Sequence, residues 1–173
     1  MIDKWLDANF KKFVGIRRWI HQHPEVGFNE HETAKYCRNL MSELGLEICK
    51  NEEMKTGFYC DYGNGNGPTI AVRCDLDALP IQEINQIDYC SIKSGVSHAC
   101  GHDAHLTNIL GLASYMVESK IEISGKVRFL FQPAEEISPG GAIVMIEAGA
   151  IEGVDHIFGG HILPSLSPEK IGI

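Results

Sequence analysis

Short apolar stretches alternate with longer stretches of helical periodicity along this chain, and this alternation constrains its fold more than any other feature. Apolar residues spaced three and four positions apart predict helices at Asp3–His23, Glu30–Leu44, Asp103–Glu118 and Ala142–Glu147. Compact apolar runs predict strands at Leu46–Cys49, Gly57–Tyr62, Thr69–Cys74, Lys126–Phe131 and Val154–His161. Strands that alternate with helices predict an α/β protein whose sheet is at least partly parallel.

The composition is that of an ordinary globular protein, with 44% hydrophobic and 22% charged residues in 173 positions. This length predicts a single domain. No apolar run approaches the roughly 18 residues of a membrane helix, and charges interrupt the start, where a signal peptide would be apolar. The net charge of −8 disfavours nucleic acid, because backbone phosphates would be repelled. We therefore expect no membrane and no nucleic-acid partner.

The chain has six cysteines, and an even number raises the alternative of disulfide bonds. The large apolar fraction and the lack of a signal-type start argue instead for reduced thiols and a cytoplasmic protein. Most of these cysteines are expected to be small apolar side chains of the core. Cys100 is the exception, because it lies in a cluster of histidines.

Polar side chains gather where the predicted strands end. The clusters are Asp75 with Asp77, Glu135 with Glu136, His161, and the segment His98–His105, which opens a predicted helix. Ligands of open α/β sheets bind beyond the carboxyl ends of the strands. We therefore expect these four clusters to converge on one crevice.

The segment around Cys100 is rich in metal-ligand side chains, namely His98, Cys100, His102, Asp103 and His105. A thiolate and an imidazole two residues apart suit a borderline-soft cation such as zinc. Gly101 between them lets the backbone turn tightly. The alternative is a helix start with solvated histidines and one buried thiol.

Glu135 and Glu136 follow a strand and a proline. If the backbone stays extended, neighbouring side chains point in opposite directions. One glutamate can then bind a metal while the other faces a water molecule as general base. Gly140 and Gly141 would permit close backbone approach nearby. An adjacent pair of glutamates on a protein surface is the alternative.

Asp75 and Asp77 would share one face of a continued strand, and one of them could orient a ligand histidine. The alternative for the two aspartates is that they cap a turn. The alternative for His161 is a structural role. Taken together, Cys100, His102, Glu136 and His161 are four credible ligands for two metal ions about 3.5–4 Å apart. Four ligands are sparse for two open sites.

Four segments in this order resemble the dinuclear-metal amidohydrolases: Arg17–Phe28, Arg73–Pro80, His98–His105 and Phe131–Glu136. That family includes hippurate hydrolase, N-acyl-L-amino-acid amidohydrolase, N-acetyldiaminopimelate deacetylase and the auxin-conjugate hydrolases. The resemblance implies a three-layer, zinc-exopeptidase-like fold with an open, mostly parallel sheet and helices on both faces. It also implies the site residues, with metal ligands at Cys100, His102, Glu136 and His161, the general base at Glu135, and an orienting aspartate at Asp77.

The implied function is metal-dependent hydrolysis of an N-acyl amino acid to a carboxylate and a free amino acid. Two divalent ions are implied, with zinc favoured by the thiolate and manganese, cobalt and nickel as alternatives. The implied partners are the small-molecule substrate and, in the full-length form, a second subunit of a homodimer.

Members of this family are considerably longer, because a lid and dimerisation domain is inserted in the catalytic domain. Residues 1–173 are therefore expected to be the amino-terminal part of the catalytic domain, without the lid and the carboxyl-terminal catalytic segment. Two alternatives stay open. One is a metal-binding fragment with weak or no activity, and the other is a cysteine amidase with Cys100 as nucleophile and His102 or His105 as base.

Overall fold

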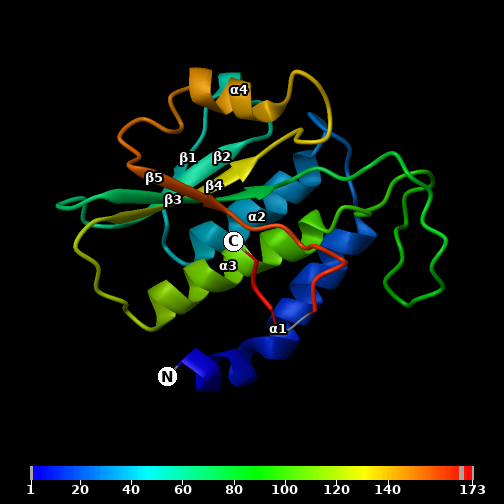
Figure 1. The fold of residues 1–173 in the computed structure, drawn as a ribbon, viewed down its shortest axis with the longest axis horizontal. Helices are drawn as coiled ribbons and strands as arrows, with labels where there is room; N and C mark the ends of the chain where they lie inside the picture. Colours follow the sequence, from blue (N-terminus) through cyan, green and yellow to red (C-terminus); the bar gives the residue numbers. More distant parts are fainter. Residues whose placement is uncertain (1, 168–169, 173) are drawn as a thin grey trace.

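A computed structural model describes residues 2–167 and 170–172 of the chain (Figure 1). The helices are α1 (Ile2–Gln22), α2 (His31–Glu43), the short 3-10 helix η1 (Glu52–Met54), α3 (His102–Glu118) and α4 (Gly141–Glu147). The strands are β1 (Ile48–Cys49), β2 (Phe58–Gly63), β3 (Thr69–Asp75), β4 (Lys126–Gln132) and β5 (His156–Gly159). Every predicted helix and strand is present, and its ends lie within two residues of the predicted ones. β1 and β5 are shorter than predicted, and the 3-10 helix η1 was not predicted.

The five strands form one open sheet in the order β1-β2-β4-β3-β5. β3 pairs in parallel with both β4 and β5, whereas β2 is antiparallel to both β1 and β4. The sheet is therefore mixed rather than mostly parallel. α3 is the crossover connection that parallel pairing of β3 with β4 requires. β2 lies on the other side of β4 and pairs with it in the antiparallel direction.

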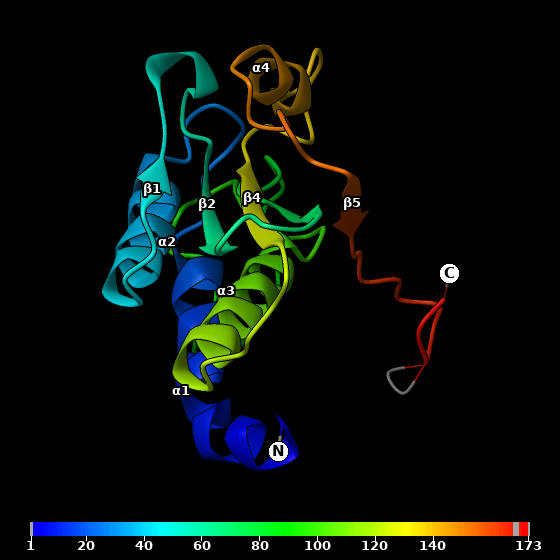
Figure 2. The same cartoon turned by 90° about the vertical axis from the view of Figure 1, so that its left-hand side faces the viewer.

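Helices cover both faces of the sheet, which confirms the predicted three layers. α1, α2 and α3 lie on one face, and α4 lies with η1 on the other (Figures 1 and 2). The larger core cluster, between the sheet and the three long helices, includes Phe58, Phe129 and Phe131. A smaller cluster under α4 contains Met54, Leu130 and Met145.

The predicted apolar face of α3 is the buried one, since Leu106, Leu110 and Ala113 are all at most 2% exposed. Cys37, Cys60 and Cys74 pack in the core, and all six cysteines of the chain are free thiols. Burial raises the pKa of Cys37 to about 12, as expected for a thiol that acts as an apolar side chain.

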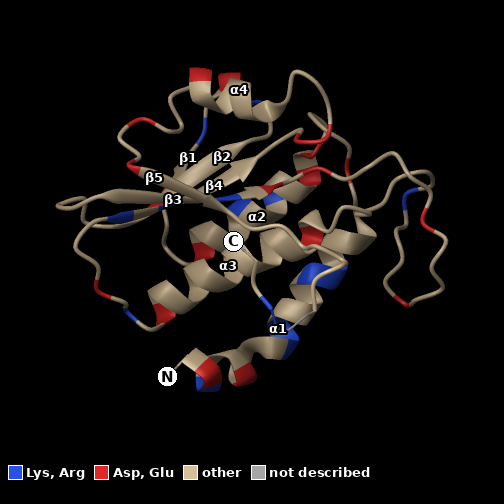
Figure 3. Ribbon diagram, in the orientation of Figure 1, with Lys and Arg blue, Asp and Glu red and all other residues tan. Residues whose placement is uncertain are grey.

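Charged residues are dispersed over the fold, and Figure 3 shows Lys and Arg on α1, the sheet and the loops. No helix within the described residues combines the length and the apolar character needed to cross a bilayer.

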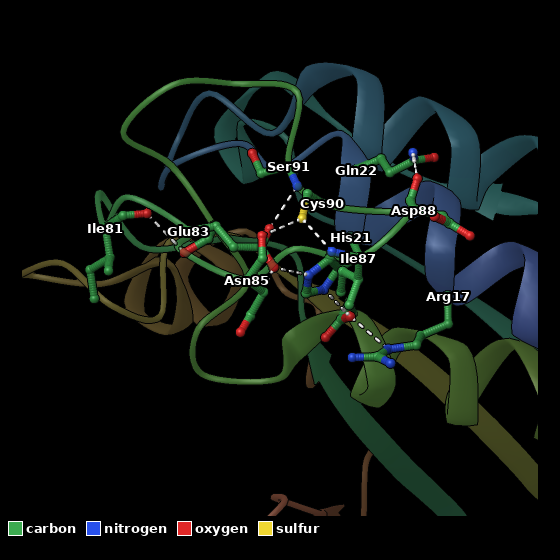
Figure 4. A network of polar contacts seen from close by, with 12 residues as sticks. Arg17, His21, Gln22, Ile81, Glu83, Asn85, Ile87, Asp88, Cys90 and Ser91 are labelled. Carbon is green, nitrogen blue, oxygen red and sulfur yellow. Dashed lines mark hydrogen bonds and ion pairs between the residues drawn. The ribbon is translucent and has the colours of Figure 1, made fainter.

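The loop that joins β3 to α3 is tied to α1 by a network of polar contacts (Figure 4). His21 lies between two carboxylates, with Nδ1 2.8 Å from Asp103 Oδ2 and Nε2 3.1 Å from Glu83 Oε1. Glu83 in turn accepts from the Ser91 amide at 2.6 Å, and Arg17 Nε donates to Asp103 Oδ2 at 2.8 Å. The loop is thereby fixed to α1 and, through His21 and Asp103, to the first turn of α3.

This network predicts a pH-dependent stability. The hydrogen bond to Asp103 raises the pKa of His21 above its ordinary value of 6.5 and, with Glu83, outweighs the opposite effect of burial. Folding therefore takes up a proton, so the contribution of His21 to the free energy of unfolding is complete below about pH 6.5 and is lost as the pH rises through the raised pKa. Urea unfolding between about pH 6 and about pH 9 should show a smaller fall in stability for His21→Gln than for the unchanged chain.

His31→Gln is the matched control, because His31 lies exposed at the start of α2. The free energy of unfolding of His31→Gln should change with pH as that of the unchanged chain does. Equal pH dependence in His21→Gln and the unchanged chain would contradict the assignment.

Candidate metal centre

The predicted polar clusters converge at one edge of the sheet. β3 and β4 end there with Asp75 and Gln132, and α3 begins there with His102. The segment that follows β5 brings His161 to the same point, with its ring centroid 6.1 Å from that of His102. Parallel pairing of β3 with β4 and β5 produces this convergence, because parallel strands end at the same edge.

Gly101 makes the tight turn between the first two candidate ligands. Its φ of 87° lies in the left-handed region, which glycine adopts without the steric cost of a Cβ atom. Gly101 is also the N-cap of α3, so His102 begins the helix while Cys100 stays outside it. The predicted role of this glycine is confirmed.

His102 lies at the centre of the cluster and is 1% exposed. Its Nδ1 is 2.8 Å from the backbone carbonyl of Asp77 and 3.5 Å from Oδ1 of the same residue. A proton on Nδ1 is therefore donated to the carbonyl, and the lone pair of Nε2 is left free. Nε2 faces three carboxylates, at 3.7 Å from Glu136, 3.9 Å from Asp75 and 4.0 Å from Glu135.

Asp77 connects His102 with the glutamate segment. Its Oδ2 accepts a hydrogen bond of 3.0 Å from the backbone amide of Glu136, while Oδ1 faces the ring of His102. Burial would raise the pKa of Asp77, but His102 and the amides of Glu136 and Glu135 outweigh it and lower the pKa. Burial likewise opposes the net rise in the pKa of His102, which Asp77 and Asp75 cause. The surroundings of His102 thus favour positive charge.

The two glutamates do not point in opposite directions, so that expectation was wrong. β4 ends at Gln132, and Ala134 has a φ of 47°, which turns the chain out of the extended conformation. Both carboxylates consequently face His102, although the side chain of Glu135 is 40% exposed and that of Glu136 only 22%. The close backbone approach expected of the following glycines is confirmed at Gly141, where a Cβ would lie 2.0 Å from the carbonyl oxygen of Pro133.

His161 and Cys100 face each other, with 3.2 Å between Nε2 and Sγ. The Nδ1 of His161 is 2.7 Å from the carbonyl of Ile162, which leaves the lone pair of Nε2 directed at the sulfur of Cys100. Burial, and then the hydrogen bond with Glu136, raises the pKa of the Cys100 thiol to about 12. Such surroundings disfavour a nucleophilic thiolate, whereas a cation beside the sulfur would favour the deprotonated ligand.

Two further residues, Asp75 and His105, belong to the cluster although they are not among the four predicted ligands. Asp75 Oδ2 lies 3.8 Å from Nδ1 of His105, and both side chains are buried. His105 Nε2 accepts a hydrogen bond of 3.0 Å from the Ile162 amide, which ties the segment after β5 to α3. The signal in the sequence was the spacing of His102 and His105, since residues three apart share a helix face.

The side chains fit divalent cations. Three groups each bring their potential ligand atoms within 4.8 Å of one another, and all three contain His102: Cys100–His102–His161, Asp75–His102–His105 and His102–Glu135–Glu136. Several of these buried atoms, among them His102 Nε2 and Glu136 Oε1, have no hydrogen-bond partner among the described residues. Buried polar atoms without partners are costly, and a cation would satisfy them. All four predicted ligands thus lie in one cluster, and their role as ligands stays a prediction.

Known proteins resemble this chain over its whole length. N-acetylcysteine deacetylase of Bacillus subtilis (strain 168) is 44% identical over 174 residues, which cover 100% of this chain and 45% of that protein. N-acyl-L-amino acid amidohydrolase of Geobacillus stearothermophilus is 43% identical and is matched over 99% of this chain and 46% of its own length. The chain therefore spans about half the length of the curated relatives it matches.

A solved structure and a family model agree with these relatives. The YXEP protein of Bacillus subtilis, described as a dinuclear metal binding peptidase from the M20 family, matches with a TM-score of 0.87 and 43% identity over 92% of this chain and 45% of that one. The model of peptidase family M20/M25/M40 matches residues 71–173, more than half of the chain. The resemblance seen in the sequence motifs is confirmed: this chain belongs to peptidase family M20/M25/M40.

Proposed function

We propose that this chain is the metal-binding, amino-terminal part of the catalytic domain of a hydrolase that cleaves the amide bond of N-acyl amino acids. The observation that carries the proposal is the cluster around His102, in which imidazole, thiol and carboxylate groups face one point. The names of the relatives support the substrate class, because they include an N-acetylcysteine deacetylase and an N-acyl-L-amino acid amidohydrolase.

The residues proposed to hold two divalent cations are Cys100, His102, Glu136 and His161, with zinc favoured by the thiolate. Bound cations would polarise the scissile carbonyl and lower the pKa of a water molecule. Asp77 would keep the Nε2 of His102 directed at the cations, because it engages the opposite ring nitrogen. Asp75 and His105 lie close enough to contribute to the same centre.

Glu135 is proposed as the general base. Its carboxylate is the more exposed of the pair and lies 4.0 Å from Nε2 of His102, so it is open to water and substrate. The carboxylate would take a proton from the attacking water and pass it to the amine nitrogen as the C–N bond breaks. The products are then a carboxylate and a free amino acid. The cytoplasmic location and the homodimer of a longer form stay predictions.

Two measurements test this function. The 173-residue chain is titrated with Zn²⁺ against a chromophoric chelator, and a form with the length of the relatives is assayed on N-acetyl amino acids with and without a chelator. We expect Zn²⁺ binding by the chain and chelator-sensitive release of free amino acid by the longer form. A metal-loaded longer form that releases none would refute the proposed reaction, and binding without turnover would favour the inactive metal-binding alternative.

A further inference from the structure

The segment of residues 21–30, which ends α1 and leads into α2, touches three of the four polypeptide segments that carry the candidate centre, all but the one with His161. Each contact falls on a residue next to a site residue. The contacts are His21 Nδ1 to Asp103 Oδ2 at 2.8 Å, the Ala78 amide to the Glu25 carbonyl at 2.7 Å, and the Ala134 amide to Glu30 Oε1 at 2.7 Å. The contacted residues adjoin His102, Asp77 and Glu135 respectively.

Glu30 makes the contact that depends most on one side chain. It is 0% exposed, and each of its carboxylate oxygens has its own donor. Oε1 accepts from the Ala134 amide, and Oε2 accepts from Oγ1 of Thr56 at 2.5 Å. A buried carboxyl group is costly to leave without partners, so these two bonds fix its position.

The backbone at Ala134 needs such a partner. Its φ of 47° is in the left-handed region, which is strained for a residue with a Cβ atom. Strained residues persist where their surroundings hold them. Here the amide is held by Glu30, and the carbonyl accepts from the Gly141 amide at 3.0 Å. This is the turn that directs both Glu135 and Glu136 toward His102.

We propose that Glu30 is a positioning residue of the metal centre, which fixes the Ala134 turn and thereby the carboxylates of Glu135 and Glu136. The proposal rests on the proposed function, in which Glu136 holds a cation. Glu30 itself does not touch the cluster, because its two oxygens are occupied by Ala134 and Thr56. Its effect on cation binding is therefore transmitted through the backbone of the turn.

The test uses two substitutions that weaken the contact and one that keeps it. Glu30→Met has a similar length but no acceptor, and Glu30→Asp keeps the charge but shortens the side chain. Glu30→Gln still offers a carbonyl oxygen to the Ala134 amide, while its amide group can donate to the rotatable hydroxyl of Thr56. Thr33→Val is the matched control, because it removes a buried 2.9 Å bond to Glu25 in the same region without a contact to Ala134.

The measurements are Co²⁺ affinity and visible absorption of the folded 173-residue chain, with urea unfolding of each variant. We expect Glu30→Met to weaken Co²⁺ affinity by about 10–100-fold, as is typical when a residue that orients metal ligands is lost. Glu30→Asp should show a smaller loss, and Glu30→Gln should bind like the unchanged chain. Thr33→Val should lower stability while affinity and spectrum stay unchanged.

The outcomes separate this proposal from the proposed function. If the unchanged chain binds Co²⁺ and folded Glu30→Asp and Glu30→Met bind it equally well, the positioning role is refuted while the metal centre stands. Equal losses in Thr33→Val and the Glu30 variants would also refute it, because stability alone would explain them. If the unchanged chain itself does not bind Co²⁺, the metal centre is refuted and the positioning role with it.

Discussion

Glu135→Gln is expected to lower kcat by roughly 10²–10⁴-fold, the usual contribution of a general base. The amide side chain has nearly the shape of the carboxylate but cannot take up the proton of the attacking water. Cation binding should persist, because the candidate ligands Cys100, His102 and His161 are unchanged. The measurement is turnover of an N-acetyl amino acid by a form with the length of the relatives, together with its metal content.

Glu136→Gln is the matched comparison, since the two glutamates lie at similar distances from Nε2 of His102, 3.7 Å for Glu136 and 4.0 Å for Glu135. We expect this variant to lose metal first and activity as a consequence, so that added metal restores part of its turnover. Equal metal loss in both variants would contradict the division of roles between base and ligand.

The second large effect is expected for Cys100→Ser. The substitution should abolish the thiolate-to-cobalt charge-transfer absorption of the Co²⁺-loaded chain. It should also weaken cation affinity more strongly than the loss of an orienting residue does, which costs about 10–100-fold. Absorption spectroscopy and competition with a chelator measure both effects. Cys90→Ser is the control, because Cys90 lies in the loop of residues 79–98, where its thiol donates to the carbonyl of Asn85.

The same variant separates a ligand from a nucleophile. If Cys100 were the nucleophile of a cysteine amidase, Cys100→Ser would keep its cation affinity, and thiol alkylation would stop turnover of the metal-loaded enzyme. The surroundings of Cys100 argue against this alternative, since burial and Glu136 raise its pKa. His161, rather than His102 or His105, is the ring at hydrogen-bond distance from its sulfur, at 3.2 Å.

Local patterns were sufficient to predict the four α-helices and the five strands of the described residues, although not the 3-10 helix η1. The apolar positions of α3 recur with the helical period, and Gly101 and Gly141 occur where the backbone approaches other atoms or has a positive φ. The pairing of the strands was not predictable in this way. β2 lies antiparallel to β4, and periodicity carries no information on the direction of a partner that is distant in sequence.

The candidate site was predicted only in part, because contacts between residues distant in the sequence leave no local pattern. Cys100 and His102 are neighbours in the sequence, so their common role could be inferred from spacing. The bond between Glu30 and Ala134 joins residues 104 positions apart, and a single glutamate ahead of a helix gives no sign of it. The direction of Glu135 depends on the left-handed turn at Ala134, which sequence reasoning treated as extended.

Residues 21–30 also precede the candidate centre in the order of synthesis. A ribosome completes this segment before any residue of the candidate metal centre, and it then adds Asp77, Cys100 and His102, the two glutamates, and finally His161. Chains are made at about 5–20 residues per second, and their amino-terminal parts begin to fold first. The segments of Asp77, His102 and the two glutamates thus each meet a hydrogen-bonding partner in residues 21–30 that is already synthesised. If these residues bind cations as proposed, the complete set of ligands is available only after His161 has been synthesised.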